Sequence, residues 1–364
     1  MPLRPASASD LLIDGKQVAG SGGTFDIVNP ATEEIVGQAA DATAEDMSAA
    51  IAAARNAFDT TDWSRDHALR ARCLRQLRDA LLAHADEFRE ITVAEVGCPV
   101  FLTHGPQLEG PITDLGYFAD LAETYEWTRD LGEAKPMGLK NRRELRAEAA
   151  GVVGAITPWN FPHQINFAKI GPALAAGCTV VLKPAPDTPW CAALVGKVIA
   201  EETDFPPGVI NIVTSSDHAL GAQLATDPRV DIVSFTGSTA TGKKVMAAAS
   251  ESLKKVFLEL GGKSAFIVLD DADLASACSM AAFAVVTHAG QGCAITTRLL
   301  VPRSKLDEAI AITRDSLAGL AAGDPTDSGT ICGPVISAAQ RQRVESYIEL
   351  ARSEGCLLYT SDAA

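Results

Sequence analysis

The stretch GVVGAITPWNFPHQINFAKIGPALAAGCTVVLKPAP, residues 151–186, decides the fold class of this chain. It begins with a short apolar run, continues with a segment of helical spacing, and ends with a second apolar run. Both runs are apolar along their length instead of alternating with polar residues. Strands of that kind are typical of a parallel sheet that helices cover on both faces, so the stretch predicts a β-α-β unit.

The same alternation of strand and helix continues along the chain. Strands are predicted at 151–159, 179–186, 208–215 and 230–237, with helices at 167–178, 190–202 and 217–228. After Glu259 a second alternation has strands at 264–271 and 296–302 and helices at 274–290 and 304–320. This order predicts an α/β fold with an open, mostly parallel sheet, followed by a second α/β part. Upstream, residues 43–60 and 64–97 have helical spacing and predict two surface-packed helices.

Composition and charge exclude several classes of protein. With 364 residues, 47% hydrophobic and 21% charged, the chain is globular. Its 31 basic and 46 acidic residues give a formal charge of −15, which repels phosphate backbones, so no nucleic-acid partner is expected. No apolar stretch reaches the ~18 residues that a membrane span needs, and the N-terminal residues resemble neither a signal peptide nor a transit peptide. We therefore expect a cytoplasmic protein.

The eight cysteines are scattered and include no C-x-x-C pair. That spacing predicts neither a metal site nor a disulfide framework, and reduced thiols fit a cytoplasmic protein. Four of the cysteines lie in apolar, periodic surroundings and are predicted to be core residues: Cys73, Cys178, Cys191 and Cys278.

The segment FTGSTATGKK, residues 235–244, follows a predicted strand and is rich in glycine. Glycines there let backbone N–H groups approach a phosphate, and the next helix adds its positive end. Residues 237–243 also match G-x-x-x-x-G-K, but Lys244 stands where a nucleoside triphosphatase has the hydroxyl that binds magnesium. A phosphate-cleaving site is therefore rejected, and the dinucleotide fingerprint G-x-G-x-x-G is missing as well.

Five motifs, in this order and spacing, resemble the aldehyde dehydrogenase superfamily over essentially the whole chain from about Gly15 onward. They are ITPWNFP from Ile156, VLKPAPDTP from Val181, FTGSTATG from Phe235, LELGGKSA from Leu258 and GQGC from Gly290. The resemblance implies oxidation of an aldehyde to a carboxylic acid through a cysteine thiohemiacetal and thioester, with NAD or NADP as acceptor. A homodimer or homotetramer is implied too. A catalytically impaired fragment, a non-catalytic homologue of the same fold, and an enzyme that passes the thioester to coenzyme A are the alternatives.

Cys293 is the expected nucleophile, because Gly290 and Gly292 remove side-chain bulk from its approach. Glu259 ends an apolar strand, where burial would raise the pKa of its carboxyl and suit it to act as a general base. An ordinary surface glutamate is the alternative for Glu259. Both roles agree with those that the resemblance implies.

Asn160 lies between two prolines in PWNFP, where an amide can donate to a developing oxyanion together with the backbone N–H of Cys293. Without the motif, a turn asparagine would be the simpler interpretation. Lys169 matches a lysine that the family associates with proton relay.

The resemblance implies a set of cofactor-binding residues. They are Ile156, Thr157, Pro158, Trp159, Lys183, Pro186, Gly221, Phe235, Thr236, Gly237, Ser238, Thr239, Gly242 and Leu260. Lys183 would hydrogen-bond the adenosine ribose, with a solvated lysine at a strand end as the alternative. Pro186 stands where many NAD-specific relatives carry a glutamate, and Asp217 replaces a glycine. NAD is the expected cofactor, with NADP possible.

The substrate entrance departs from the family pattern. Ala168 stands where many relatives have tryptophan, and Gln164 is polar where an apolar residue is common, whereas Phe161 keeps an aromatic wall. We expect a wider, slightly more polar entrance that admits a bulky or aromatic aldehyde.

The resemblance also implies a division into domains. Residues 1–123 and 150–258 would bind the dinucleotide, 124–149 would form a bridging and oligomerisation hairpin, and 259–355 would be an incomplete catalytic domain. The last residues, 356–364, read CLLYTSDAA and resemble the translation of a sequencing adapter. We interpret them as an adapter-derived tail, with a natural short tail as the alternative.

Overall fold

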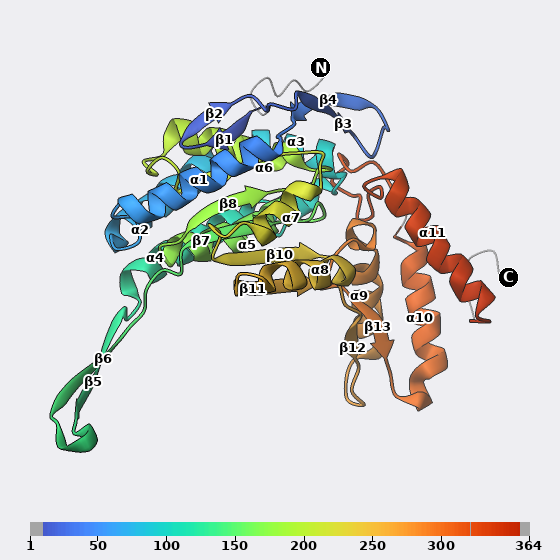
Figure 1. Ribbon diagram of the computed structural model, residues 1–364. Helices are drawn as coiled ribbons and strands as arrows, with labels where there is room; N and C mark the ends of the chain where they lie inside the picture. The colour runs from blue at the N-terminus through green and yellow to red at the C-terminus, as the bar shows by residue number, and fades with distance from the viewer. Residues whose placement is uncertain (1–9, 321, 357–364) are drawn as a thin grey trace.

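A seven-stranded sheet forms the centre of the larger part of the molecule (Figure 1). Its strands are β1 (Leu11–Ile13), β2 (Lys16–Val18), β7 (Val152–Ile156), β8 (Thr179–Lys183), β9 (Ile210–Ile212), β10 (Ile232–Gly237) and β11 (Lys255–Leu260). In this computed structural model, which describes residues 10–320 and 322–356, the strand order is β11-β10-β7-β8-β9-β1-β2. The strands from β11 to β9 are parallel, and β1 and β2 extend the sheet as an antiparallel pair. The predicted open, mostly parallel α/β sheet is confirmed.

The parallel strands that follow β7 in the sequence lie on both sides of it. Strands β8 and β9 follow on one side, and β10 and β11 then return to the other side. In open α/β sheets such a reversal of strand order marks the ligand crevice at the carboxyl ends of the strands. Here the reversal lies between β7 and β10, and we refer to the strand ends beside it as the crevice. In the register, Ile156 lies opposite Lys183 and Phe235, and Thr236 lies opposite Glu259. Residues from separate motifs thus reach one edge of the sheet.

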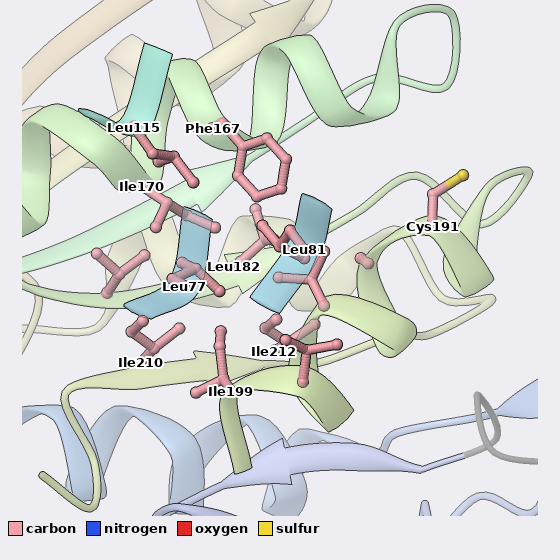
Figure 2. Packing of buried hydrophobic residues seen from close by; sticks show 14 of the residues in the cluster. Leu77, Leu81, Leu115, Phe167, Ile170, Leu182, Cys191, Ile199, Ile210 and Ile212 are labelled. Atoms are coloured by element: carbon pink, nitrogen blue, oxygen red, sulfur yellow. The ribbon is translucent and has the colours of Figure 1, made fainter. Parts of the chain in front are cut away.

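Helices cover the two faces of this sheet. They are α1 (Ala44–Thr60), α2 (His67–Ala83), α3 (Ala85–Val96), α4 (Glu109–Thr124), α5 (Pro162–Ala175), α6 (Pro189–Glu202), α7 (Ala219–Thr226) and α8 (Thr239–Ser250). On one face, side chains of α2, α4, α5 and α6 pack with Leu182 and Ile210 (Figure 2). On the other face, α1, α7 and α8 pack with Val181 and Val233. Because Val181 and Leu182 are adjacent, successive residues of β8 supply two different cores. The four cysteines predicted as core residues are all buried.

One face of β11 is an exception to this covering. Its residues alternate, with Lys255, Phe257 and Glu259 exposed and the residues between them half-buried. Phe257 has an exposed fraction of 62%. Helix α5 packs over the neighbouring strands, and within the described residues no helix covers the outer part of this face.

The smaller part of the molecule contains a parallel pair, β12 (Ser264–Ile267) and β13 (Thr296–Leu300). Its helices are α9 (Leu274–Val286), α10 (Leu306–Ala318) and α11 (Ala338–Ser353). Two antiparallel hairpins form sheets of their own: β3 (Thr24–Val28) with β4 (Ile35–Ala40), which packs against the larger part through Ile27 and Ala39, and β5 (Thr128–Ala134) with β6 (Asn141–Arg146). The β5–β6 hairpin projects far from the body in Figure 1. The interpretation of residues 356–364 as a tail concerns, apart from Cys356, positions outside the described residues.

One local prediction was incomplete. The helix predicted over 64–97 is two helices, α2 and α3, because the backbone leaves the helical region at His84 (φ −100°, ψ 14°). No glycine or proline marks that break. Among the helices of the described chain, none is long and apolar enough to cross a bilayer.

A buried carboxylate joins α3 to the start of α6. Glu95 is fully buried and accepts hydrogen bonds from the backbone N–H groups of Trp190 (2.6 Å) and Cys191 (2.9 Å). These donors belong to the first turn of α6 and have no partner within the helix. Burial raises the pKa of Glu95 to about 8, and the two backbone donors oppose that rise. Glu95 therefore fixes the start of α6, directly after the loop that follows Lys183.

We predict that Glu95→Ala destabilises the protein by about 3 kcal/mol, since it leaves two buried N–H groups without an acceptor. Urea unfolding measures the change. The matched control is Glu90→Ala on the exposed side of the same helix, which should stay within about 0.5 kcal/mol of the parent. Equal midpoints for the two variants would contradict the capping role.

Candidate active site

Cys293 lies in a loop between the short 3-10 helix η3 (Thr287–Gly290) and β13, and its side chain is half-buried. Burial raises the pKa of the Cys293 thiol, and the negative charge of Glu259 raises it further. Backbone N–H groups of Cys293 and Ala294 partly oppose this rise. The thiol therefore keeps its proton near neutral pH.

Asn160 reaches the same loop from the end of β7. Its side-chain nitrogen donates to the backbone oxygen of Gln291 at 2.5 Å, two residues before Cys293. An amide nitrogen carries two hydrogens, so one N–H is left for another acceptor. Asn160 and Cys293, predicted from separate motifs, are thus brought together.

The backbone of Asn160 is fixed by two side chains. Its carbonyl oxygen accepts from Gln107 Nε2 at 2.9 Å and from His288 Nε2 at 2.9 Å. Gln291 extends the network, because its amide donates to His288 O and accepts from Ile336 N. Gln107 and His288 were not among the site residues predicted from the sequence. Gln291 stands inside GQGC, and that motif could have identified it.

Glu259 ends β11 beside Thr236, on the face of the sheet that also carries Ser234. The side chain of Glu259 is exposed, so the burial expected for it is not observed. The cause is the uncovered face of β11 described above. The negative charge of Glu259 raises the pKa of the Cys293 thiol.

Lys169 approaches the same face from α5. It is buried, with an exposed fraction of 6%, and donates to Ser234 Oγ at 2.9 Å. Burial lowers the pKa of Lys169 to about 8, and attraction to Glu259 opposes this decrease. An amine with this pKa can exchange a proton near neutral pH. Ser234, the hydrogen-bond partner of Lys169, was not predicted, because nothing in the strand pattern indicates such a contact.

Lys183 occupies the carboxyl end of β8 and is buried. Its ammonium has two long hydrogen bonds, to Pro184 O and Ser215 O, each 3.4 Å. Burial lowers the pKa of Lys183 to about 8, and the charges of Asp217 and Asp41 oppose this decrease. Lys183 is therefore not the solvated strand-end lysine considered as an alternative. Asp41, from the loop between β4 and α1, was not predicted from the sequence to lie near Lys183.

Asp41 is held rigidly at this end of the crevice. It accepts from Ser215 Oγ (2.8 Å), Ser216 N (2.9 Å) and Ser216 Oγ (2.7 Å). Burial alone would raise the pKa of Asp41, but these hydrogen bonds lower it overall. A permanent negative charge thus stands beside Lys183.

Small residues shape the crevice between these groups. A Cβ atom at Gly221 would lie 3.6 Å from Ile156 Cδ1 and 3.8 Å from Lys183 Cδ, so these three residues meet. A Cβ atom at Gly242 would lie 2.7 Å from Leu260 Cδ2, so glycine lets α8 approach β11 closely. At the end of β7, Thr157 Oγ1 is buried and has no hydrogen-bond partner among the described residues.

The other predicted cofactor residues divide into two groups. Pro158, Pro186, Gly237, Ser238 and Thr239 follow the ends of β7, β8 and β10, and Ser238 caps α8 by accepting from Thr241 N at 3.2 Å. The side chains of Trp159 and Phe235 pack into the hydrophobic cores on opposite faces of the sheet.

Comparisons with known proteins agree with this geometry. The model of the aldehyde dehydrogenase family matches residues 17–363. The chain is 40% identical over 354 residues to 3-succinoylsemialdehyde-pyridine dehydrogenase of a Pseudomonas species, covering 96% of this chain and 71% of that protein. It is 38% identical to geranial dehydrogenase of Castellaniella defragrans, covering 91% and 68%.

Solved structures give the same result for the fold. Aldehyde dehydrogenase C of Pseudomonas syringae, in complex with NAD+ and octanal, matches with a TM-score of 0.89 and 34% identity over 97% of this chain and 71% of that one. Betaine aldehyde dehydrogenase of Staphylococcus aureus, in complex with NAD+, matches with a TM-score of 0.92 and 33% identity over 97% and 71%. This chain belongs to the aldehyde dehydrogenase family of enzymes, which confirms the resemblance stated from its five motifs.

Proposed function

We propose that this protein oxidises an aldehyde to a carboxylic acid, with Cys293 as nucleophile and NAD+ as electron acceptor. The observation that carries the proposal is the meeting of Cys293, Asn160 and Glu259 at the carboxyl edge of the sheet. The names of the relatives support the substrate class, since they include dehydrogenases of a semialdehyde and of geranial, and a complex with octanal.

The reaction begins when the Cys293 thiol loses its proton to solvent water. The thiolate then forms a carbon–sulfur bond with the aldehyde carbonyl, and the carbonyl electrons move to its oxygen. The free N–H of the Asn160 amide and the backbone N–H of Cys293 stabilise that oxyanion. When bound, the nicotinamide dinucleotide supplies the acceptor for the hydride whose loss turns the thiohemiacetal into a thioester.

Glu259 acts in the second half of the reaction. Its carboxylate takes a proton from water, and the hydroxide attacks the thioester carbonyl. The carbon–sulfur bond breaks, so that the carboxylic acid leaves and the Cys293 thiolate is restored. The neutral amine of Lys169, which its pKa of about 8 makes available near neutral pH, takes the proton from Glu259 and passes it to solvent. The closeness of Glu259 to the sulfur favours water over coenzyme A as the acyl acceptor.

The residues of the crevice fit a dinucleotide. Thr157 Oγ1 is a buried polar atom that lacks a partner in the described part of the chain, and a ligand hydroxyl or amide would satisfy it. Lys183 keeps donor capacity for ribose hydroxyls, because its two hydrogen bonds are long. The start of α8, with Gly237, Ser238 and Thr239, offers backbone N–H groups to a pyrophosphate.

Charge at the ribose end favours NAD+ over NADP+. Pro186 stands where many relatives have a glutamate that binds the ribose hydroxyls. However, the negative charges of Asp41 and Asp217 both affect the pKa of Lys183. Two carboxylates would repel a ribose phosphate. Asp41 and Asp217, from two other loops, thus supply the negative charge that is missing at position 186.

The substrate entrance and the assembly complete the proposal. Phe161 and Gln164 are half-buried and Ala168 is exposed, which is compatible with a wide entrance for a bulky or aromatic aldehyde. We assign dinucleotide binding to residues 1–123 and 150–258, catalysis to 259–355, and contacts between subunits to 124–149. The exposed β5–β6 hairpin supports a homodimer or homotetramer.

We predict that Cys293→Ala abolishes NADH formation from an aldehyde and leaves NAD+ affinity within about twofold, because the sulfur acts on the substrate and not on the cofactor. Absorbance at the NADH band and calorimetric titration measure the two quantities. Cys332→Ala, a half-buried cysteine in the same part of the chain, is the control and should keep its turnover. Persisting turnover in Cys293→Ala would refute the nucleophile.

We predict that Glu259→Gln accelerates alkylation of Cys293 by iodoacetamide severalfold at pH 7.5. Removing the negative charge takes away one cause of the raised pKa of this thiol, so more thiolate is present at the same pH. Peptide mass spectrometry follows Cys293 separately from the other thiols. An unchanged or slower rate would show that Glu259 does not act on the sulfur.

A further inference from the structure

His288 stands five residues before Cys293 in a backbone conformation that side chains other than glycine rarely adopt. His288 has φ 54° and ψ 41°, Ala289 has φ 53° and ψ 29°, and Gly290 has φ 72°. Three left-handed residues in succession make an unusual turn, and two of them carry a Cβ atom. Strain of this kind persists only where the surrounding contacts hold it.

The contacts that hold His288 are polar and buried. The residue has an exposed fraction of 0%, and its Nε2 lies 2.9 Å from Asn160 O. A carbonyl oxygen only accepts, so Nε2 carries the hydrogen and donates it. The backbone of His288 donates to Ile331 O at 3.2 Å and accepts from Gln291 N at 3.1 Å.

The imidazole is neutral in this environment. Burial lowers the pKa of His288 to about 4, and the hydrogen bond to Asn160 opposes this decrease. The ring meets Phe161 edge to face, with centroids 5.3 Å apart. A neutral ring with its hydrogen on Nε2 can therefore remain a donor to Asn160 across the range of pH in which the site would work.

We propose that His288 is a positioning residue, which ties the oxyanion-binding amide to the loop of the nucleophile. Asn160 touches this loop twice, through Nδ2 to Gln291 O and through its carbonyl to His288. The two contacts fix both the backbone and the side chain of Asn160 relative to Cys293. This inference rests on the proposed function, because it assigns Asn160 to the oxyanion.

Gln107 provides an internal comparison. It donates to the same oxygen of Asn160 at 2.9 Å, but it comes from the segment before α4 and makes none of the described contacts to the loop of Cys293. If the oxygen merely needed a donor, Gln107 and His288 would be equivalent. The two side chains differ because His288, through its left-handed turn, belongs to the segment that leads to Cys293, whereas Gln107 does not.

The experiment compares His288→Ala, His288→Asn, Gln107→Ala and Ala289→Gly in steady-state kinetics over pH 6 to 9. We expect His288→Ala to lower kcat about tenfold or more with little change in the KM for NAD+, since small misplacements of reacting groups are costly. His288→Asn should recover part of kcat, because asparagine tolerates the left-handed region and still donates. Gln107→Ala should lose less than His288→Ala.

Ala289→Gly controls for strain, because it relaxes the same turn without changing the bond to Asn160, and its kcat should stay within about twofold. The shape of the pH profile should be the same in all variants, as the imidazole does not titrate in this range. A kcat for folded His288→Ala within twofold of the parent, or equal losses in His288→Ala and Gln107→Ala, would overturn the proposal. If His288→Ala fails to fold, His288→Gly takes its place, because glycine tolerates the left-handed turn and lacks the donor; a parental kcat in that variant overturns the proposal as well.

The rate of Cys293 alkylation tests the role of His288 without requiring aldehyde oxidation. Loosening the loop would expose the thiol and remove part of the burial that raises its pKa, so His288→Ala should react severalfold faster with iodoacetamide. A parent protein without aldehyde oxidation would defeat the proposed function, while this rate would still test His288. An unchanged rate in His288→Ala would defeat the positioning role on its own.

Discussion

The reversal of strand order between β7 and β10 is the constraint on which the candidate site depends. Parallel strands end at the same edge of a sheet, and a reversal leaves that edge open between the two central strands. Here the loop after β7 supplies Asn160, β8 supplies Lys183, and β11 supplies Glu259. Cys293 comes from the second part of the molecule and meets this edge through the contact between Gln291 and Asn160. The site thus consists of strand ends from one part and a loop from the other.

The pKa values in the site depend on which ionisable groups this arrangement buries. Lys169 and Lys183 are both buried, and burial lowers the pKa of each to about 8. Carboxylates oppose this decrease at both positions: Glu259 for Lys169, and Asp217 with Asp41 for Lys183. Each buried ammonium therefore keeps acidic groups nearby, as the cost of burying an isolated charge requires. One pair is suited to proton transfer beside Cys293, and the other to recognition of a ribose.

The strands and helices that form the crevice could be predicted from the sequence because they are long and uniformly apolar or strongly periodic. The three-residue strands β1 and β2 are too short to give such a signal. Partners far apart in the chain, such as Asp41 beside Lys183 or Glu95 at the start of α6, have no local pattern either. The exposure of Glu259 could not be predicted, since it depends on whether a helix covers the last strand. His288 lies next to a family motif, but only its φ angle and its bond to Asn160 make it a candidate.

The most direct test of the central claim, that Cys293 and Glu259 act on one carbonyl carbon, is mass spectrometry of Glu259→Gln after rapid mixing with NAD+ and an aldehyde. The account predicts one burst of NADH and a stable adduct on Cys293 with the mass of the acyl group, because the thioester forms and the base for its hydrolysis is absent. A burst without an adduct on Cys293, or turnover equal to that of the parent, would contradict it.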